Sequence, residues 1–137
     1  MVEHIRHLKA SYFRTLDGKL WDEFAQLFTS DCEFITYRDP DGLEPKRRCG
    51  REAIVDSVRR KVGAAVTVHQ GSLLHIEIQS TESATAIWQM TDYTEIVEGA
   101  SRRILRGTGK YYERYRLMDE KWMISRLELK RTSLVIE

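Results

Sequence analysis

The chain has 137 residues, of which 42% are hydrophobic and 31% charged, and its formal net charge is +1. This balance is ordinary for a globular domain; it has neither the strongly basic character of nucleic-acid-binding proteins nor an apolar run long enough to cross a membrane. Two cysteines without paired spacing exclude a disulfide framework and fit a reducing cytoplasm, so we expect a single cytoplasmic domain over residues 1–137 without a signal peptide.

Helical periodicity marks the first half of the chain. Apolar residues recur every three or four positions between Ile5 and Leu16, and again from Leu20 onward. Between these two runs, Asp17 and Gly18 break the pattern. The elements predicted here are helices over residues 2–16, 19–29 and 51–62, a short strand over 33–38 and a turn at 39–42. The basic residues of positions 46–51 are expected in a solvated turn.

After residue 66 the hydrophobic period changes from helical to two. Trp88 and Met90, for example, share a parity with Ala84 and Ala86. Long strands are predicted over residues 67–79, 83–97, 103–117 and 121–135. Strands joined by short polar turns predict an antiparallel meander. Three short helices cannot cover both faces of such a sheet, but they can close one end of a curled sheet and leave a pocket inside.

Two polar residues of the first helix are candidates for a site. Tyr12 lies one turn before Leu16 on the apolar face, which carries its hydroxyl toward the interior, where it needs a hydrogen-bond partner. Asp17 stands at the end of this helix. Its spacing alone favours a structural role, because aspartate is a preferred capping residue for the helix that follows.

A histidine opens the first long strand. His69 is out of phase with Leu74 and Ile76, so they share a face only if the strand bulges, and we expect the bulge at Gly71. A histidine can accept a proton near neutral pH, and a buried carboxylate bonded to its other nitrogen fixes the tautomer.

Two more polar residues share a parity with apolar neighbours in the last strands. Asp92 is in phase with Trp88 and Met90, which places it at the rim of a pocket or past the buried stretch. Arg131 is in phase with Leu129 but out of phase with residues near the start of its strand. Arg131 therefore reaches the interior only if this strand also bulges, and there it needs an anionic partner or polar ligand.

Four segments together resemble a known family. They are Tyr-Phe-Arg-Thr-Leu-Asp-Gly-Lys-Leu-Trp from residue 12, His69, Ala-Thr-Ala-Ile-Trp from residue 84, and Lys-Trp-Met-Ile-Ser-Arg from residue 121. The chain resembles the SnoaL-like family of the nuclear transport factor 2-like superfamily, and in particular its bile acid 7α-dehydratase, scytalone dehydratase and hexachlorocyclohexane dehydrochlorinase lyases. The resemblance implies a cone-shaped α+β barrel, in which a curved mixed or antiparallel sheet is closed by three helices around a pocket.

The resemblance also implies site residues and partners. Asp17 and His69 match the family's catalytic dyad, and Tyr12 matches a catalytic pocket tyrosine. Four further residues are expected to bind substrate: Tyr37, Trp88, Asp92 and Arg131. The implied enzyme is a homo-oligomer, a trimer or a dimer, that needs no cofactor or metal and acts on a small apolar molecule such as a steroid or aromatic polyketide. His4 and His7, without a neighbouring carboxylate, make a weak metal site.

Two alternatives to a lyase stay open. The same residues could serve a ketosteroid-isomerase-like or polyketide-cyclase-like enzyme, which moves a proton without losing a leaving group. The chain also resembles, at the level of fold, the small scaffold subunit of ring-hydroxylating dioxygenases. In that case Asp17 would be a helix cap and His69 a packing residue, because a shared fold does not by itself establish chemistry.

Overall fold

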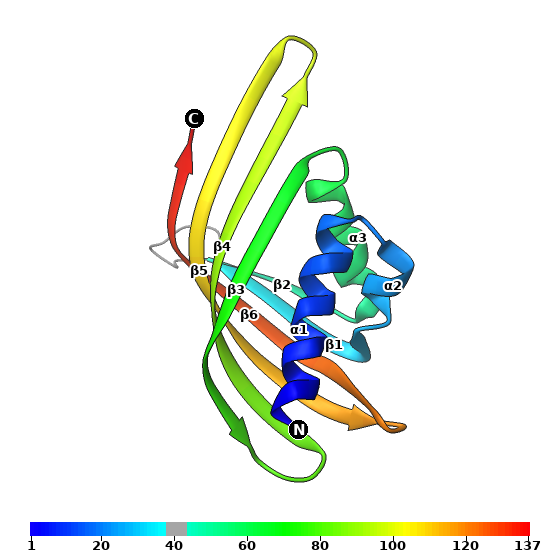
Figure 1. Ribbon diagram of the computed structural model, residues 1–137. Coiled ribbons are helices and arrows are strands. Elements are labelled where there is room, and N and C mark those ends of the chain that lie inside the picture. Colours follow the sequence, from blue (N-terminus) through cyan, green and yellow to red (C-terminus); the bar gives the residue numbers. More distant parts are fainter. Residues whose placement is uncertain (38–43) are drawn as a thin grey trace.

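The computed structural model describes residues 1–37 and 44–137, which form three helices and six strands of an α+β fold (Figure 1). In chain order the elements are α1 (Val2–Asp17), α2 (Trp21–Ala25), β1 (Phe28–Tyr37), β2 (Pro45–Cys49), α3 (Arg51–Val62), β3 (Val66–Ile78), β4 (Ser83–Glu98), β5 (Ser101–Met118) and β6 (Lys121–Ile136). The first and third helices and the four long strands are confirmed where the hydrophobic periods predicted them.

One curved, mixed sheet holds all six strands, in the order β2-β1-β6-β5-β4-β3. Strands β3 to β6 form the expected antiparallel meander, whereas β1 runs parallel to β6. The three helices lie on one side of this sheet, with α1 crossing its concave face (Figure 1). The sheet is not closed into a continuous barrel, because β2 and β3 are its two edges. The arrangement is the α+β cone.

The region between α1 and α3 differs from the prediction. Helix α2 ends at Ala25 instead of residue 29, and Phe28 already belongs to β1. The apolar residues that continued the helical pattern are used by the sheet: the N–H of Ile124 donates to the carbonyl of Leu27, and Phe28 pairs with Ile124. Backbone pairing with β6 therefore overrides the local helical period. The predicted turn at 39–42 lies outside the described residues.

The prediction of a turn for the basic residues of positions 46–51 was also wrong. Residues 46–48 belong to strand β2, which pairs antiparallel with β1. Arg48 donates hydrogen bonds to Ser57 and Thr36, and Arg51, the first residue of α3, donates two to the carbonyl of Phe28. These arginines join β2 and α3 to β1.

Two β-bulges decide which side chains face the helices. In β3 the register shifts at Leu74, three residues later than the expected position, Gly71. Leu73 consequently packs toward the core and Leu74 is exposed. In β6 the shift falls at Ser125. This shift places Ile124 and Leu127 on the same buried face. Arg131 is in phase with Leu127, so the bulge that the sequence required for Arg131 to reach the interior is present.

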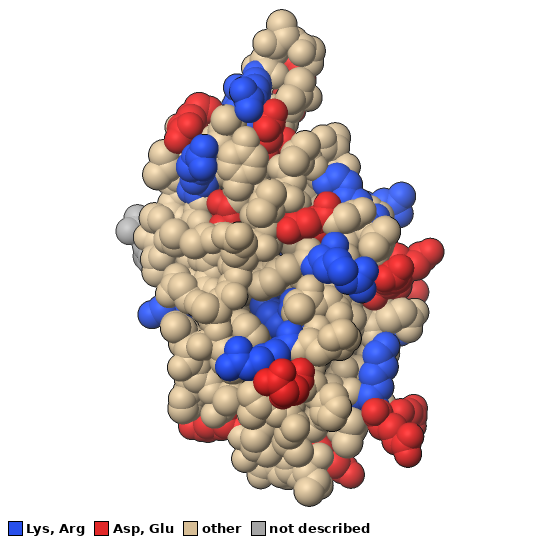
Figure 2. Space-filling view, viewed as in Figure 1, with Lys and Arg blue, Asp and Glu red and all other residues tan. Residues whose placement is uncertain are grey.

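The core lies between the concave face of the sheet and the helices. It contains large apolar side chains from both layers, among them Ile5, Phe24, Met90 and Leu127, none of which is exposed to solvent. On the surface, positive and negative side chains are interspersed over the face shown in Figure 2. Among residues 1–37 and 44–137, no helix is both long and apolar enough to span a bilayer.

Candidate active site

The end of α1 is joined to the start of β3 by one carboxylate. Asp17 Oδ1 lies 2.7 Å from His69 Nδ1, and Asp17 Oδ2 accepts the backbone N–H of His69 at 2.8 Å. Thr67 also donates its hydroxyl to Asp17 Oδ1 at 2.9 Å. The spacing of Asp17 suggested that it caps α2, but it does not. The N-cap of α2 is Leu20, which makes no side-chain capping bond.

The imidazole of His69 is held on a second side by an aromatic ring. Phe13, one turn before Asp17 on α1, stacks against it with ring centroids 6.0 Å apart and an interplanar angle of 11°. Gly71 leaves space for this contact, because a Cβ at that position would lie 2.8 Å from Phe13. A neutral imidazole that donates its Nδ1–H to this carboxylate has Nε2 as its acceptor.

A buried ion pair faces Nε2 of His69. Arg131 donates to the two carboxylate oxygens of Asp92 at 3.0 and 2.7 Å, and Asp92 Oδ2 lies 4.0 Å from His69 Nε2. Burial alone would raise the pKa of Asp92. The hydrogen bonds and charge of Arg131, with smaller contributions from His69 and Lys61, outweigh burial and hold this pKa below its ordinary value. Asp92 is therefore a fixed negative charge beside the imidazole.

The pair fits only because the neighbouring strand lacks a side chain at one position. Gly107 of β5 lies opposite Asp92 of β4, and a Cβ there would collide with both Arg131 Nη1 and Asp92 Oδ1. The glycine thus sets the space in which Arg131 and Asp92 meet.

Two tyrosine hydroxyls meet deeper in the core. The hydroxyls of Tyr12 on α1 and Tyr111 on β5 are 3.4 Å apart, and both side chains are almost fully buried. Burial raises the pKa of Tyr12 well above its ordinary value. The electrostatic interaction with Tyr111 and the hydrogen bond to its hydroxyl raise this pKa further. Burial also raises the pKa of Tyr111. Both groups are neutral hydrogen-bond donors over the physiological pH range.

The remaining predicted binding residues lie elsewhere. Trp88 is buried in the core, and its indole N–H donates a hydrogen bond to the hydroxyl of Tyr115 at 2.9 Å. Tyr37 pairs with Lys130 across β1 and β6, and the Lys130 ammonium lies 5.5 Å from the centroid of the Tyr37 ring and 5.3 Å from that of Tyr112. The structure does not bring Tyr37 together with Asp17 and His69.

Sequence reasoning missed one charged pair that lies next to the tyrosines. Lys9 of α1 and Glu113 of β5 form a buried ion pair. The available signal was parity, because Glu113 stands between Tyr111 and Tyr115 on the apolar face of β5. Lys9 carried the helical equivalent of this signal, because it lies four residues after Ile5 and three before Tyr12 on the apolar face of α1.

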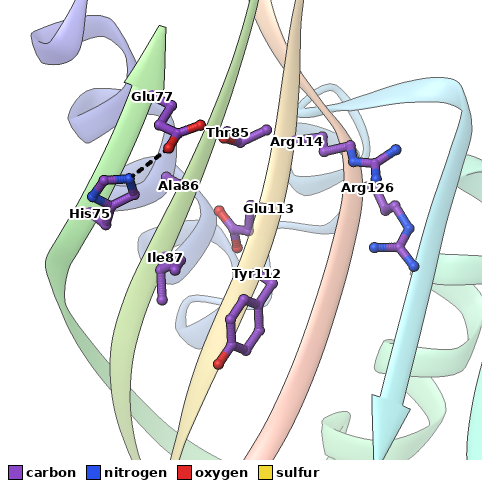
Figure 3. Close-up of a pocket in the computed structure, with 9 residues that line it drawn as sticks. All are labelled: His75, Glu77, Thr85, Ala86, Ile87, Tyr112, Glu113, Arg114 and Arg126. Atoms are coloured by element: carbon purple, nitrogen blue, oxygen red, sulfur yellow. Dashed lines mark hydrogen bonds and ion pairs between the residues drawn. The ribbon is translucent and has the colours of Figure 1, made fainter. Parts of the chain in front are cut away.

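A hollow of about 290 Å³ lies on the opposite face of the sheet, away from the helices (Figure 3). Residues of β3 to β6 line it, including His75, Tyr112 and Arg126. There, His75 Nε2 lies 3.1 Å from Glu77 Oε1. The interior pocket beside His69 stays a prediction. Within the described part of the chain, no group of three or more His, Cys, Asp or Glu residues could hold a metal ion.

Comparison with solved structures gives the same fold. A provisionally named scytalone dehydratase from Novosphingobium aromaticivorans is 23% identical, with a TM-score of 0.82 over 98% of this chain and 85% of that chain. A type 2 hexachlorocyclohexane dehydrochlorinase is 18% identical, with a TM-score of 0.84 over 98% and 87%. A protein of unknown function from Mycobacterium tuberculosis is 24% identical, with a TM-score of 0.74 over 98% and 73%.

A family model describes nearly the whole chain. The model of the SnoaL-like domain matches residues 2–128, which include both members of the Asp17–His69 pair and Asp92. The sequence motifs, the cone fold and this match agree, and the chain belongs to the SnoaL-like family of the nuclear transport factor 2-like superfamily.

Proposed function

We propose that this chain is a cofactor-independent lyase of the dehydratase kind, in which His69 removes a proton from a carbon beside a carbonyl or leaving group. The observation that carries the proposal is the 2.7 Å contact between His69 Nδ1 and Asp17 Oδ1. This contact keeps the proton on Nδ1, so the lone pair of Nε2 is the one that accepts the substrate proton. The bonds from the His69 N–H and Thr67 hold the carboxylate in place.

Each remaining residue has a role in the same reaction. The substrate C–H bond breaks and its proton moves to His69 Nε2, while its electron pair forms the new double bond. The leaving group departs with its own bonding pair; when it is a hydroxyl, it takes the proton from His69 Nε2, so that water is released and the imidazole is neutral again. Asp17 and Asp92 stabilise the imidazolium that forms, and Tyr12 donates a hydrogen bond to the oxygen that gains charge. Arg131 keeps Asp92 ionised and aimed at His69.

The surroundings of His69 favour a small apolar substrate. Phe13 covers one side of the imidazole, and the rings of Tyr12 and Tyr111 pack against Phe13. Aromatic side chains gathered beside a few polar groups suit a flat molecule such as a steroid or an aromatic polyketide. The dehydratase and dehydrochlorinase names of proteins with the same fold are consistent with elimination chemistry.

Self-association is part of the proposal. The edge strand β3 exposes Val66, Val68 and Leu74, whose apolar side chains would be covered by a second copy. A homo-oligomer, either a trimer or a dimer, is expected, and sedimentation velocity at several protein concentrations measures it.

Of the alternatives, a purely scaffolding subunit has less support. That reading needs Asp17 as a cap and His69 as a packing residue, whereas Asp17 bonds to His69 through both carboxylate oxygens. An isomerase would use the same residues. The two enzymes differ in product mass, because a dehydratase releases water and an isomerase does not.

The test is a panel of β-hydroxyketones, hydroxysteroids and aromatic polyketides, with products identified by mass spectrometry. His69→Ala is expected to abolish turnover while the protein stays folded. His75→Ala is the matched control, because His75 lies on the same strand but contacts Glu77. An active His69→Ala protein would contradict the proposal, and so would an equal loss of activity in His75→Ala.

A further inference from the structure

The buried ion pair of Lys9 and Glu113 occupies the layer of the core beyond Tyr12 and Tyr111, and the reaction proposed above does not use it. The two side chains are 1% and 0% exposed and are in direct contact through Lys9 Nζ and Glu113 Oε2. The other carboxylate oxygen, Oε1, accepts a hydrogen bond from Tyr115, whose hydroxyl is also bonded to Trp88. Both oxygens of Glu113 therefore have a partner.

The ammonium of Lys9 lies over three aromatic rings. Its Nζ is 3.5 Å from the ring centroid of Tyr111, 4.0 Å from that of Tyr12 and 4.8 Å from that of Phe13. A cation at these distances is attracted to the face of a ring and resists its displacement. The same three rings surround the candidate site, since Phe13 stacks on His69 and the two tyrosines place their hydroxyls together.

The pair also has a direction. Its positive end contacts the three rings of the site, and its negative end contacts Tyr115 on the far side. In an interior of low dielectric constant, fixed charges act strongly and need no reorganisation during a reaction. The charge of Glu113 acts to raise the pKa of both Tyr12 and Tyr111, which favours their neutral hydroxyls.

Stability alone does not account for such a pair. Taking two charges out of water costs free energy that their attraction repays only with excellent geometry, and apolar replacements of similar size are often neutral or stabilising. Burial lowers the pKa of Lys9 to about 8 even though Glu113 acts to raise it, so its charge is held against a desolvation cost. Perturbed groups of this kind concentrate at functional sites.

We propose that Lys9 and Glu113 are positioning residues, which fix the rings of Tyr12 and Tyr111 beside the candidate site. The placement of the rings does not depend on the proposed lyase function, so it is tested without a substrate.

The measurement uses the protein without ligand. In Lys9→Met/Glu113→Gln the charges are removed with little change in size. Ring-flip rates of Tyr12 and Tyr111, measured by NMR on protein with ¹³C-labelled tyrosine, are expected to rise at least tenfold. The matched control is Lys130→Met/Glu128→Gln, which makes the same substitutions in an ion pair of β6 with a half-exposed lysine and is expected to leave both rates unchanged. Unchanged rates in the buried-pair variant would overturn the positioning role.

Thermal unfolding verifies that each variant folds, and Lys9→Gln/Glu113→Gln replaces the buried-pair variant if Lys9→Met/Glu113→Gln does not fold.

Discussion

Asp17 Oδ1 lies 2.7 Å from His69 Nδ1, although 52 positions separate the two residues in the chain. The carboxylate stands at the last residue of α1, and the imidazole at the fourth residue of β3. Because the same carboxylate binds the backbone N–H of His69, it fixes the strand as well as the ring. The tautomer of the proposed base is thus set by the way α1 docks on β3.

Removing the charge of Asp17 should impair catalysis without unfolding the protein. In Asp17→Asn the imidazole loses its charged partner and can adopt the other tautomer. We expect kcat to fall roughly 10²–10⁴-fold with a small change in KM. Steady-state kinetics with a substrate found in the proposed panel measure kcat and KM. Asp22→Asn, an exposed aspartate in the first turn of α2, is the control. An Asp17→Asn enzyme with unchanged kcat would show that Asp17 does not orient the base.

Filling the space at Gly107 should separate Asp92 from Arg131. A methyl group at this position collides with both side chains, so Gly107→Ala is expected to lose about 1–3 kcal/mol of unfolding free energy. Turnover should fall as well, because Asp92 is displaced from His69. Urea denaturation and kinetics give the two effects. Gly99→Asn is the control, since Gly99 lies in an exposed turn with φ 63°, which asparagine tolerates. Full stability in Gly107→Ala would contradict the close fit.

The Asp92 carboxylate should make the unfolding free energy depend on pH in the acid range. Its pKa is lower in the folded protein than in the unfolded chain, so its contribution is complete above a pH of about 4 and is lost as pH falls through the folded pKa. Wild type should exceed Asp92→Asn in unfolding free energy by at most about 3–5 kcal/mol at pH 7. The difference should shrink below pH 4.

Denaturation series at pH 7, 5, 4 and 3 follow this difference. Asp119→Asn, in the exposed turn after β5, should differ from wild type by a small and nearly constant amount. A difference for Asp92→Asn that is as large at pH 3 as at pH 7 would rule out the depressed pKa.

Lys9 should make the unfolding free energy depend on pH in the alkaline range. Its pKa is about 8 when folded, against an ordinary value of 10.5, so between these values the unfolded chain binds more protons. The unfolding free energy of wild type should therefore rise relative to Lys9→Met/Glu113→Gln from pH 8 to pH 9.5, by up to about 1.4 kcal/mol per pH unit. Denaturation at four pH values measures the slope. A flat difference would mean that Lys9 titrates normally.

The sequence predicted those parts of the fold whose residues follow one regular period. Helix α1 and strands β3 to β6 have long amphipathic patterns, and their bounds were close. Strand β2 was missed because Pro45–Cys49 has no apolar alternation and is held by backbone pairing with β1. The end of α2 was misplaced because the pairing of Phe28 with Ile124 has no local signature.

The site was partly predictable for a similar reason. A family motif pointed to Asp17 and His69, but the residues alone favoured a cap, since only the fold brings His69 within reach. The bulge at Leu74 is a property of the pairing between β3 and β4, so its position could not be read from β3 alone. Lys9 and Glu113 were overlooked because charged residues usually lie at the surface, and each becomes explicable only once its partner is known.

The parallel pairing of β1 with β6 has a consequence for how the protein folds during synthesis. Glu33 and Arg126 are paired across 93 positions, so the middle of the sheet stays incomplete until the last strand has been made. Asp17 and His69 leave the ribosome well before Arg131. The edge of β1 that pairs with β6 therefore lacks its partner strand for most of synthesis, and formation of the native sheet is a late, slow step that chaperones are suited to protect.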